Sequence, residues 1–344
     1  MTMMLIRKLL LVGVCLTMCS AWSPGRPGWS MPTTRRFAAQ SDDFPAWEAA
    51  MVQEHKKDCA NAKQMFATVE TSTSNGIGEG GDYTGGWDAF PVGQDCVGLG
   101  NAPYLTAEGT PNRDLIHVSK EPVLTGDECD TLVAAAEKRA VQAGWGSRYT
   151  YAASSHEVHV ADCGPVAKVV LDTLLSRTLL PALAALYPGR FGSDPSKLRV
   201  YNALVVKYDA STGRNAMPVH TDFGLLTLNI CLNELGQDYQ GGGTWFQALD
   251  GALAPSKGSA IAHASPLAHS GCPTSSGERY QLVVFVLHQD FPDVGGRLQH
   301  LGSTMLNQGN DTSAALRALR HSVRSNNLDP ETWFQLGRAR QAGG

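Results

Sequence analysis

The sequence lacks a strong excess of charge of either sign. Its 28 lysines and arginines stand against 32 aspartates and glutamates, which gives a formal net charge of -4 over 344 residues. A chain this close to neutral does not present the broad cationic surface that nucleic acids or anionic membranes attract. Charged residues make up 17% and hydrophobic residues 43% of the chain, as in folded globular proteins rather than disordered or fibrous ones.

Cysteine pairs of the CxxC type are missing as well. Eight cysteines occur, but no two of them are separated by two residues, which disfavours a structural zinc site of that kind. Cys15 and Cys19 belong to an apolar N-terminal run. The remaining six form an even number, which fits an oxidising compartment but leaves their pairing open. A Cys59–Cys96 disulfide is one hypothesis.

Acidic residues are absent from positions 1–41. Two basic residues precede the apolar run 9–18, and small residues follow at 19–21, which is typical of a secretory signal peptide and too short for a comfortable membrane span. An uncleaved N-terminal anchor is the alternative. The basic stretch 22–41 resembles the bipartite plastid presequences of algae with secondary plastids. We therefore expect the secretory pathway (ER lumen or secreted), with a plastid as the alternative location.

The 36 glycines and 18 prolines favour a loop-rich β architecture. Helical patterns precede the β region, with a capping box at 125–128 and a long apolar stretch at 166–187 that Pro181 interrupts. Short β-branched or aromatic runs follow, separated by turn residues. These runs are 198–208, 225–233, 243–248, 258–264 and 280–288. Helices followed by strands predict a β-sandwich or barrel buttressed by helices on one side.

The chain divides, by pattern, into five segments. They are a signal peptide (1–21), a basic leader (22–41), an irregular N-terminal extension that opens with a helix at 42–57 (42–112), a compact domain (113–293) and a helical tail (294–344). Part of the tail resembles the first helix of a tetratricopeptide repeat. A single copy cannot stack on a neighbour, so we expect it to pack on the domain.

The strongest chemical signal is His220-Thr221-Asp222 together with His269. Side chains at i and i+2 of an extended segment point the same way, so His220 and Asp222 can face one ion. A distant histidine then completes two nitrogens and one carboxylate on one face of a metal, which suits nonheme Fe(II). Arg279 follows His269 by ten residues. A buried guanidinium grips a carboxylate through two parallel hydrogen bonds, as the distal carboxylate of 2-oxoglutarate requires.

In this context the stretch 198–285 resembles the 2-oxoglutarate/Fe(II) dioxygenases of the prolyl 4-hydroxylase and procollagen lysyl hydroxylase group. The run TLNICLN at 227–233 and the His-to-Arg spacing are most similar to the procollagen lysyl hydroxylases. GGGTWF at 241–246 matches the glycine-rich turn of the group, and SPL at 265–267 fits as well. A weaker match from about Leu115 covers the lead-in helices of the group.

The resemblance implies that His220, Asp222 and His269 bind Fe(II) and that Arg279 binds 2-oxoglutarate. Tyr208 matches a tyrosine that contacts this co-substrate in relatives. The implied fold is α+β, mostly β, with a double-stranded β-helix (jelly roll) core, N-terminal helices and a short C-terminal helical tail. The implied reaction hydroxylates an unactivated C–H, most readily of a peptidyl proline or lysine. It converts 2-oxoglutarate and O2 to succinate and CO2, with ascorbate as a further cofactor.

Strand alternation places Thr227, Asn229 and Cys231 on one face. Thr227 and Asn229 are therefore candidates for co-substrate binding, with an ordinary barrel interior as the alternative for Asn229 and for Tyr208. Relatives often have a bulkier polar or aromatic residue where Cys231 stands. His263 precedes the His269 loop and is expected to be a packed core histidine.

Two other function classes stay open. One is a metal-binding jelly roll of another type, such as a cupin-like isomerase or a hydrolase, for which Arg279 has no use. The other is a non-catalytic binding protein with a relic barrel, against which the intact triad argues. The expected substrate is a peptide or protein, although a small molecule remains an option, because substrate choice depends on loops rather than on fold.

Overall fold

The computed structural model describes residues 44–69, 86–93, 106, 108, 110, 112–146, 155–189, 194–309, 311–325 and 330–343. The predicted signal peptide and basic leader lie outside these residues, as does Cys96. The division of the chain into five segments stays a prediction.

Two antiparallel sheets form the core. The strands are β1 (Trp87–Pro91), β2 (Asp114–Ser119), β3 (His156–His159), β4 (Leu198–Asp209), β5 (Met217–His220), β6 (Leu226–Cys231), β7 (Tyr239–Gly241), β8 (Thr244–Phe246), β9 (Gly251–Leu253), β10 (Ala260–Ala264), β11 (His269–Gly271) and β12 (Thr274–His288). The large sheet has the order β1-β2-β10-β6-β12-β4-β3, with β7 paired to β12, and the small sheet has the order β5-β11-β8-β9. This two-sheet antiparallel core confirms the expected jelly-roll fold class.

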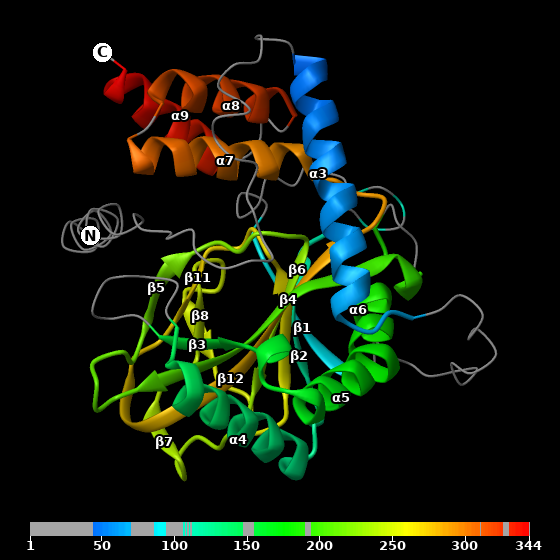
Figure 1. Cartoon of the computed structure of the whole chain (residues 1–344), viewed down its shortest axis with the longest axis vertical. Coiled ribbons are helices and arrows are strands. Elements are labelled where there is room, and N and C mark those ends of the chain that lie inside the picture. Colours follow the sequence, from blue (N-terminus) through cyan, green and yellow to red (C-terminus); the bar gives the residue numbers. More distant parts are fainter. Residues whose placement is uncertain are drawn as a thin grey trace.

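The helices pack around this core in two groups (Figure 1). They are α3 (Phe44–Met65), α4 (Gly126–Ala143), α5 (Pro165–Leu174), α6 (Leu180–Leu186), α7 (Val294–Gln308), α8 (Thr312–Ser325) and α9 (Pro330–Ala342). Figure 1 shows α4 and α5 at one end of the molecule and α7, α8 and α9 together at the other, with α3 alongside. The helical tail is thus present, and it forms a layer of three helices.

Local sequence signals account for most of these boundaries. The capping box forms as predicted, because the Thr125 side chain accepts from the Glu128 N–H and the Glu128 carboxylate accepts from the Thr125 N–H. The five predicted strand runs all contain observed strands. Strand β1 was not predicted: it lies in the stretch taken as irregular and pairs with β2, burying Trp87. The pairing of β1 with β2 joins segments far apart in the chain, and the five residues of β1 alone do not predict it.

The interruption of the apolar helix begins earlier than Pro181. Helix α5 passes through a π-helical segment at Leu175–Leu179 before α6 starts. Proline lacks an N–H and clashes with the carbonyl four residues before it, which accounts for the wider turn ahead of Pro181. The whole stretch Pro165–Leu186 is long and apolar enough to cross a membrane by length and composition, and 56% of its most apolar part is buried inside the protein.

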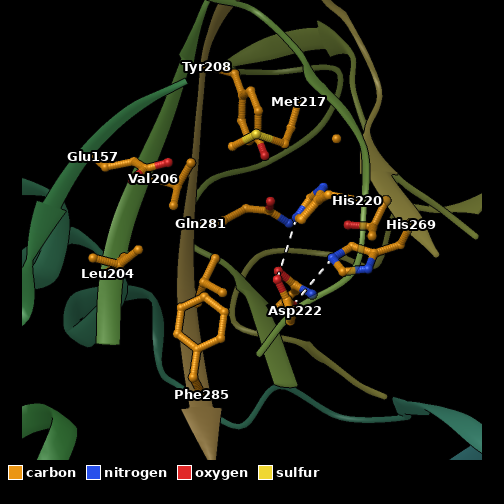
Figure 2. A pocket seen from close by; sticks show the side chains of 14 residues that line it. Glu157, Leu204, Val206, Tyr208, Met217, His220, Asp222, His269, Gln281 and Phe285 are labelled. Atoms are coloured by element: carbon orange, nitrogen blue, oxygen red, sulfur yellow. Dashed lines mark ion pairs between the residues drawn. The ribbon is translucent and has the colours of Figure 1, made fainter. Parts of the chain in front are cut away.

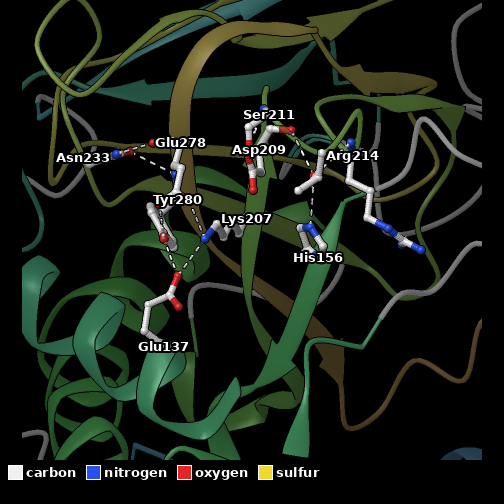
Figure 3. Close-up of polar contacts among 10 residues, drawn as sticks. Glu137, His156, Lys207, Asp209, Ser211, Arg214, Asn233, Glu278 and Tyr280 are labelled. Carbon is white, nitrogen blue, oxygen red and sulfur yellow. Dashed lines mark hydrogen bonds and ion pairs between the residues drawn. The ribbon is translucent and has the colours of Figure 1, made fainter. Parts of the chain in front are cut away.

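Alternation along β4 separates the two faces of the large sheet. Lys207 points outward to α4 and forms ion pairs with Glu137 at 3.0 Å and Glu278 at 2.7 Å, while its neighbours Val206 and Tyr208 line the inner cavity. The Tyr280 hydroxyl lies within hydrogen-bonding distance of both carboxylates and donates its one hydrogen between them (Figure 3). This outer cluster attaches α4 to the sheet and leaves the inner face for chemistry.

The described cysteines all carry free thiols. They are Cys59, Cys129, Cys163, Cys231 and Cys272. The hypothesis of a Cys59–Cys96 disulfide involves Cys96, which lies outside the described residues, so it stays a prediction. Cys59 is buried between α3 and the sheet, and burial raises the pKa of its thiol to about 11.

Helix α3 is fixed to the end of β12 and to α7 by buried polar contacts. His55 donates from Nε2 to the His288 carbonyl at 2.9 Å, so its Nδ1 accepts from Arg297 at 3.1 Å. Arg297 also donates to Asp58 at 2.8 Å. Burial, assisted by Arg297, lowers the pKa of His55 from 6.5 to about 4, and burial lowers the pKa of His288 likewise to about 4.

These shifts predict acid sensitivity of the metal-free protein. Between pH 6.5 and pH 4 the unfolded chain binds protons on His55 and His288 that the folded chain excludes. The free energy of unfolding is therefore fully maintained above pH 6.5 and falls as the pH drops towards 4. Calorimetric melting at a series of pH values should show the fall. The dependence should be shallower in a His55→Gln variant, and equal slopes in the two proteins would contradict the assignment.

Candidate metal centre

Antiparallel pairing of β5 with β11 brings two distant histidines face to face. His269 opens β11 and is the register partner of His220, the last residue of β5. The ring centroids are 4.4 Å apart. Asp222 follows in the next loop, and its N–H donates to the Ser265 carbonyl at 2.9 Å. The sheet register, together with this loop contact, therefore assembles the three residues that the sequence predicted.

The two histidines are held in the same tautomer. His220 donates from Nδ1 to the Pro218 carbonyl and His269 from Nδ1 to the Leu267 carbonyl, each at 2.8 Å. A carbonyl oxygen only accepts, so in each ring the hydrogen sits on Nδ1 and Nε2 carries the lone pair. The Nε2 atoms lie 3.5 Å and 3.4 Å from the carboxylate oxygens of Asp222. Both histidines thus present their ligand atoms to the same point (Figure 2).

Asp222 is held in its ionised form. Burial opposes ionisation, but the facing His269 and His220 hold the pKa of its carboxyl well below the usual range. Burial lowers the pKa of His269 from 6.5 to about 3, and the Asp222 carboxylate opposes this shift. Thr227 donates from its hydroxyl to the second Asp222 oxygen at 2.9 Å. Neutral imidazoles and an oriented carboxylate are the forms that coordinate a metal ion.

The ligand set fits a divalent transition metal. The ligand atoms of His220, Asp222 and His269 all lie within 4.8 Å of one another. Two imidazoles and one carboxylate on one side of an ion leave its remaining positions open, which is the pattern of nonheme Fe(II) oxygenases. His263 lies directly behind, with its ring 4.6 Å from that of His269, and is fully buried as expected of a core histidine.

Arg279 occupies the middle of β12, opposite Tyr208 on β4. It is 1% exposed, and its guanidinium lies 5.1 Å from the centroid of the Tyr208 ring. One amino group donates to the Gly243 carbonyl at 3.0 Å, while Nε has no hydrogen-bond partner in the described chain. The ion pairs found among the described residues do not include Arg279. A buried guanidinium without a carboxylate is incomplete until an anion binds.

Two glycines make room for this arrangement. Gly242, in the predicted glycine-rich turn, has φ +74°, and a Cβ there would lie 2.9 Å from Arg279 Cδ. A Cβ on Gly271 would lie 2.5 Å from the Tyr208 hydroxyl. The turn at 241–243 therefore allows the backbone to approach the arginine, and the GGGTWF motif has a physical reason.

A cavity connects the triad to Tyr208 (Figure 2). Apolar side chains form much of its wall. They are Leu204, Val206, Met217, Val283 and Phe285. Asn229 lines the cavity as predicted and contacts His263 through its side-chain amide at 3.2 Å. Thr227 does not line it: the predicted co-substrate residue lies behind Asp222, where it orients the ligand. Cys231 is buried near Arg279, and burial raises the pKa of its thiol.

Two cavity residues escaped the sequence prediction. Gln281 is 2% exposed, its Nε2 has no partner among the described residues, and its side chain extends from β12 towards His220 (Figure 2). The period-2 rule applied from Arg279 would have identified it, because both residues lie on the same strand face. Glu157 on β3 also lines the cavity.

Comparisons with known proteins agree with this geometry. No family model matches the chain. It is 39% identical over 111 residues to procollagen-lysine,2-oxoglutarate 5-dioxygenase 1 of Rattus norvegicus, covering 31% of this chain and 15% of that protein. It is 31% identical over 191 residues to the multifunctional procollagen lysine hydroxylase and glycosyltransferase LH3 of Homo sapiens, covering 53% of this chain and 25% of that protein. The aligned part is thus a quarter or less of each curated relative.

Solved structures give weaker similarity. A viral collagen prolyl hydroxylase from Paramecium Bursaria Chlorella virus-1 matches with TM-score 0.38 and 19% identity over 50% of this chain and 94% of the other. A Pseudomonas putida prolyl-4-hydroxylase matches with TM-score 0.40 and 17% identity over 50% of this chain and 92% of the other. The sequence relatives are the stronger evidence, and by them the homologues of this chain are procollagen-lysine 2-oxoglutarate dioxygenases.

Proposed function

We propose that this protein is an Fe(II)- and 2-oxoglutarate-dependent dioxygenase that hydroxylates a peptidyl side chain, converting 2-oxoglutarate and O2 to succinate and CO2. The observation that carries the proposal is Arg279, a buried cation that does not itself line the cavity but lies against the Tyr208 ring of its wall, and for which no ion pair is found in the described chain. A dicarboxylate that chelates a metal at the triad can place its distal carboxylate on this guanidinium. A hydrolase or isomerase built on the same triad has no use for it.

Each residue then has a defined task. His220, Asp222 and His269 would hold the iron, which when bound supplies the oxygen activation that side chains cannot perform. Arg279 and the Tyr208 ring would bind and orient the distal carboxylate. The apolar wall of the cavity, including Val283 and Phe285, limits the access of water to the reacting centre. Ascorbate, as the reductant that maintains Fe(II), belongs to the proposal through the family resemblance.

For the substrate we infer a peptidyl lysine in preference to a proline. Glu157 supplies a carboxylate to the cavity wall in addition to Asp222, and its side chain points from β3 towards the interior (Figure 2). Ser155 donates to it at 3.2 Å. A carboxylate at this place stabilises an ammonium group near the metal, whereas the neutral proline ring gains nothing from it. The lysyl hydroxylase relatives support the same choice.

The test measures succinate formation by the full chain with Fe(II) and ascorbate, using lysine- and proline-containing peptides in parallel. We expect turnover to rise with the lysyl peptide. A Glu157→Gln variant should raise the KM for that peptide about tenfold, because a charged hydrogen bond contributes about 1.5–3 kcal/mol, part of which solvent screens. Peptide-independent turnover should be unchanged.

The controls separate the reaction class from the substrate. Succinate that rises with the prolyl peptide and not with the lysyl peptide would refute the lysine assignment while retaining the dioxygenase. Absence of succinate with every peptide, from folded protein shown to bind iron, would contradict the dioxygenase proposal. For the location of the protein we infer the secretory pathway from the N-terminal pattern, with the plastid as the alternative.

A further inference from the structure

The loop that carries Asp222 is fixed from the barrel side. Phe223 follows Asp222 directly, and its carbonyl accepts from the Tyr201 hydroxyl on β4. The Tyr201 and Phe223 rings meet edge to face with centroids 5.7 Å apart. Gly224 has φ +115°, and a Cβ there would lie 3.0 Å from the Tyr201 ring. The Leu225 N–H then donates to the Val286 carbonyl at 2.8 Å. Strands β4 and β12 thus determine one face of this loop.

The other face of the loop meets the helical layer. The guanidinium carbon of Arg297, on α7, lies 5.0 Å from the centroid of the Phe223 ring. His300, one turn further along α7, has its ring centroid 5.7 Å from that of Phe223. Arg297 is 6% exposed, and a cation on an aromatic face is attracted more strongly where water is excluded. The residue next to a metal ligand is therefore held between the barrel and a helix from the tail.

Arg297 has little freedom to adjust. Its Nε donates to the Pro292 carbonyl at 2.9 Å, one amino group donates to Asp58 at 2.8 Å, and the other donates to His55 Nδ1 at 3.1 Å. Asp58 and His55 both belong to α3. With every nitrogen bonded, the guanidinium plane is fixed, and so is the surface that it presents to Phe223.

We propose that Arg297 is a positioning residue for the metal centre, acting through the Phe223 ring to hold the loop that carries Asp222. Helices α3 and α7 are then part of the metal site rather than an accessory module for recruiting partners. The proposal rests on the proposed function, since it requires that His220, Asp222 and His269 bind a metal. It assigns the C-terminal tail a role that no motif in its sequence predicts.

A purely structural role would give a different result. If α7 only stabilised the fold, loss of the Arg297 contacts would lower the melting temperature and leave the metal affinity of the folded protein unchanged. If Arg297 positions Asp222, metal affinity falls even far below the melting temperature. Residues that orient metal ligands typically change affinity by about 10–100-fold when replaced.

The experiment titrates the full-length protein with Mn(II) and follows free Mn(II) by electron paramagnetic resonance, which needs neither substrate nor turnover. Arg297→Met keeps the bulk of the side chain and removes the charge. We expect roughly tenfold weaker Mn(II) binding, the lower end of the range for orienting residues. Phe223→Leu should weaken binding to a similar extent. Because both act through one contact, the double variant should be no weaker than the weaker single variant.

Ser322→Ala is the matched control. Ser322 donates from α8 to the Gly295 carbonyl at 2.7 Å, and its other hydrogen bond found among the described residues is with Thr332 on α9 rather than with the metal loop. Its replacement should lower the melting temperature and leave Mn(II) affinity at the wild-type value. Unchanged affinity in Arg297→Met, or equal losses in Ser322→Ala, would overturn the proposal. Absence of Mn(II) binding by the wild type would instead refute the metal centre itself. If Arg297→Met does not fold, Arg297→Lys and Phe223→Leu carry the same test.

Discussion

Replacing Asp222 by alanine is expected to reduce 2-oxoglutarate turnover by roughly 10³-fold or more. The carboxylate is the one anionic ligand of the triad. A metal centre lowers the reaction barrier by several kcal/mol, and each 1.36 kcal/mol changes the rate tenfold. The substitution also leaves two neutral imidazoles, which bind divalent ions more weakly. Succinate formation and bound iron, measured on the same preparation, should fall together.

Thr221→Ala is the matched control for this result. Thr221 lies between His220 and Asp222 in the sequence and is exposed, so its replacement keeps the ligand set intact. We expect near-normal iron content and turnover. Asp222→Ala protein that retained full turnover with normal iron content would exclude the triad as the reacting centre. Removing iron from the wild type with a chelator should reproduce the Asp222→Ala result, and added Fe(II) should reverse it.

Replacing Arg279 by methionine is expected to weaken 2-oxoglutarate binding by about 10²–10³-fold, with the metal still bound. Truncating one partner of a buried, hydrogen-bonded charge pair costs about 2–5 kcal/mol, and each 1.4 kcal/mol is tenfold in affinity. Arg279→Lys keeps the charge but loses the planar fork, so an intermediate loss is expected. Calorimetric titration of the Mn(II)-loaded protein with 2-oxoglutarate measures both variants.

Metal affinity provides the internal control for the arginine. The contacts found for Arg279 among the described residues include the Gly243 carbonyl and the Tyr208 ring and no triad side chain, so Mn(II) binding should be the same in Arg279→Met and the wild type. Wild-type affinity for 2-oxoglutarate in Arg279→Met would favour a metal-binding jelly roll of another type. Loss of Mn(II) binding in that variant would show instead that the substitution disturbs the barrel.

Much of the metal centre was predictable because its signals are local or are spaced by strand geometry. His220 and Asp222 lie two apart at a strand end, and the interval from His269 to Arg279 is similar to that of the dioxygenase group that the sequence resembles. Strand alternation correctly places Asn229 on the cavity face. The same rule predicts Gln281, because it lies two residues after Arg279 on the same strand. Thr227 shows the limit of this reasoning, because alternation gives the face of a strand and not the atom that a side chain reaches.

The sequence by itself determined the residue types of the site, the antiparallel strand class and the capped helix at Thr125, since these depend on neighbours within a few positions. Only the tertiary structure decided the register that places His269 opposite His220, the pairing of β1 with β2, and the contact between Arg297 and Phe223. Each of these joins segments far apart in the chain, and the free energy that selects it comes from burial and packing across the whole fold rather than from local preference.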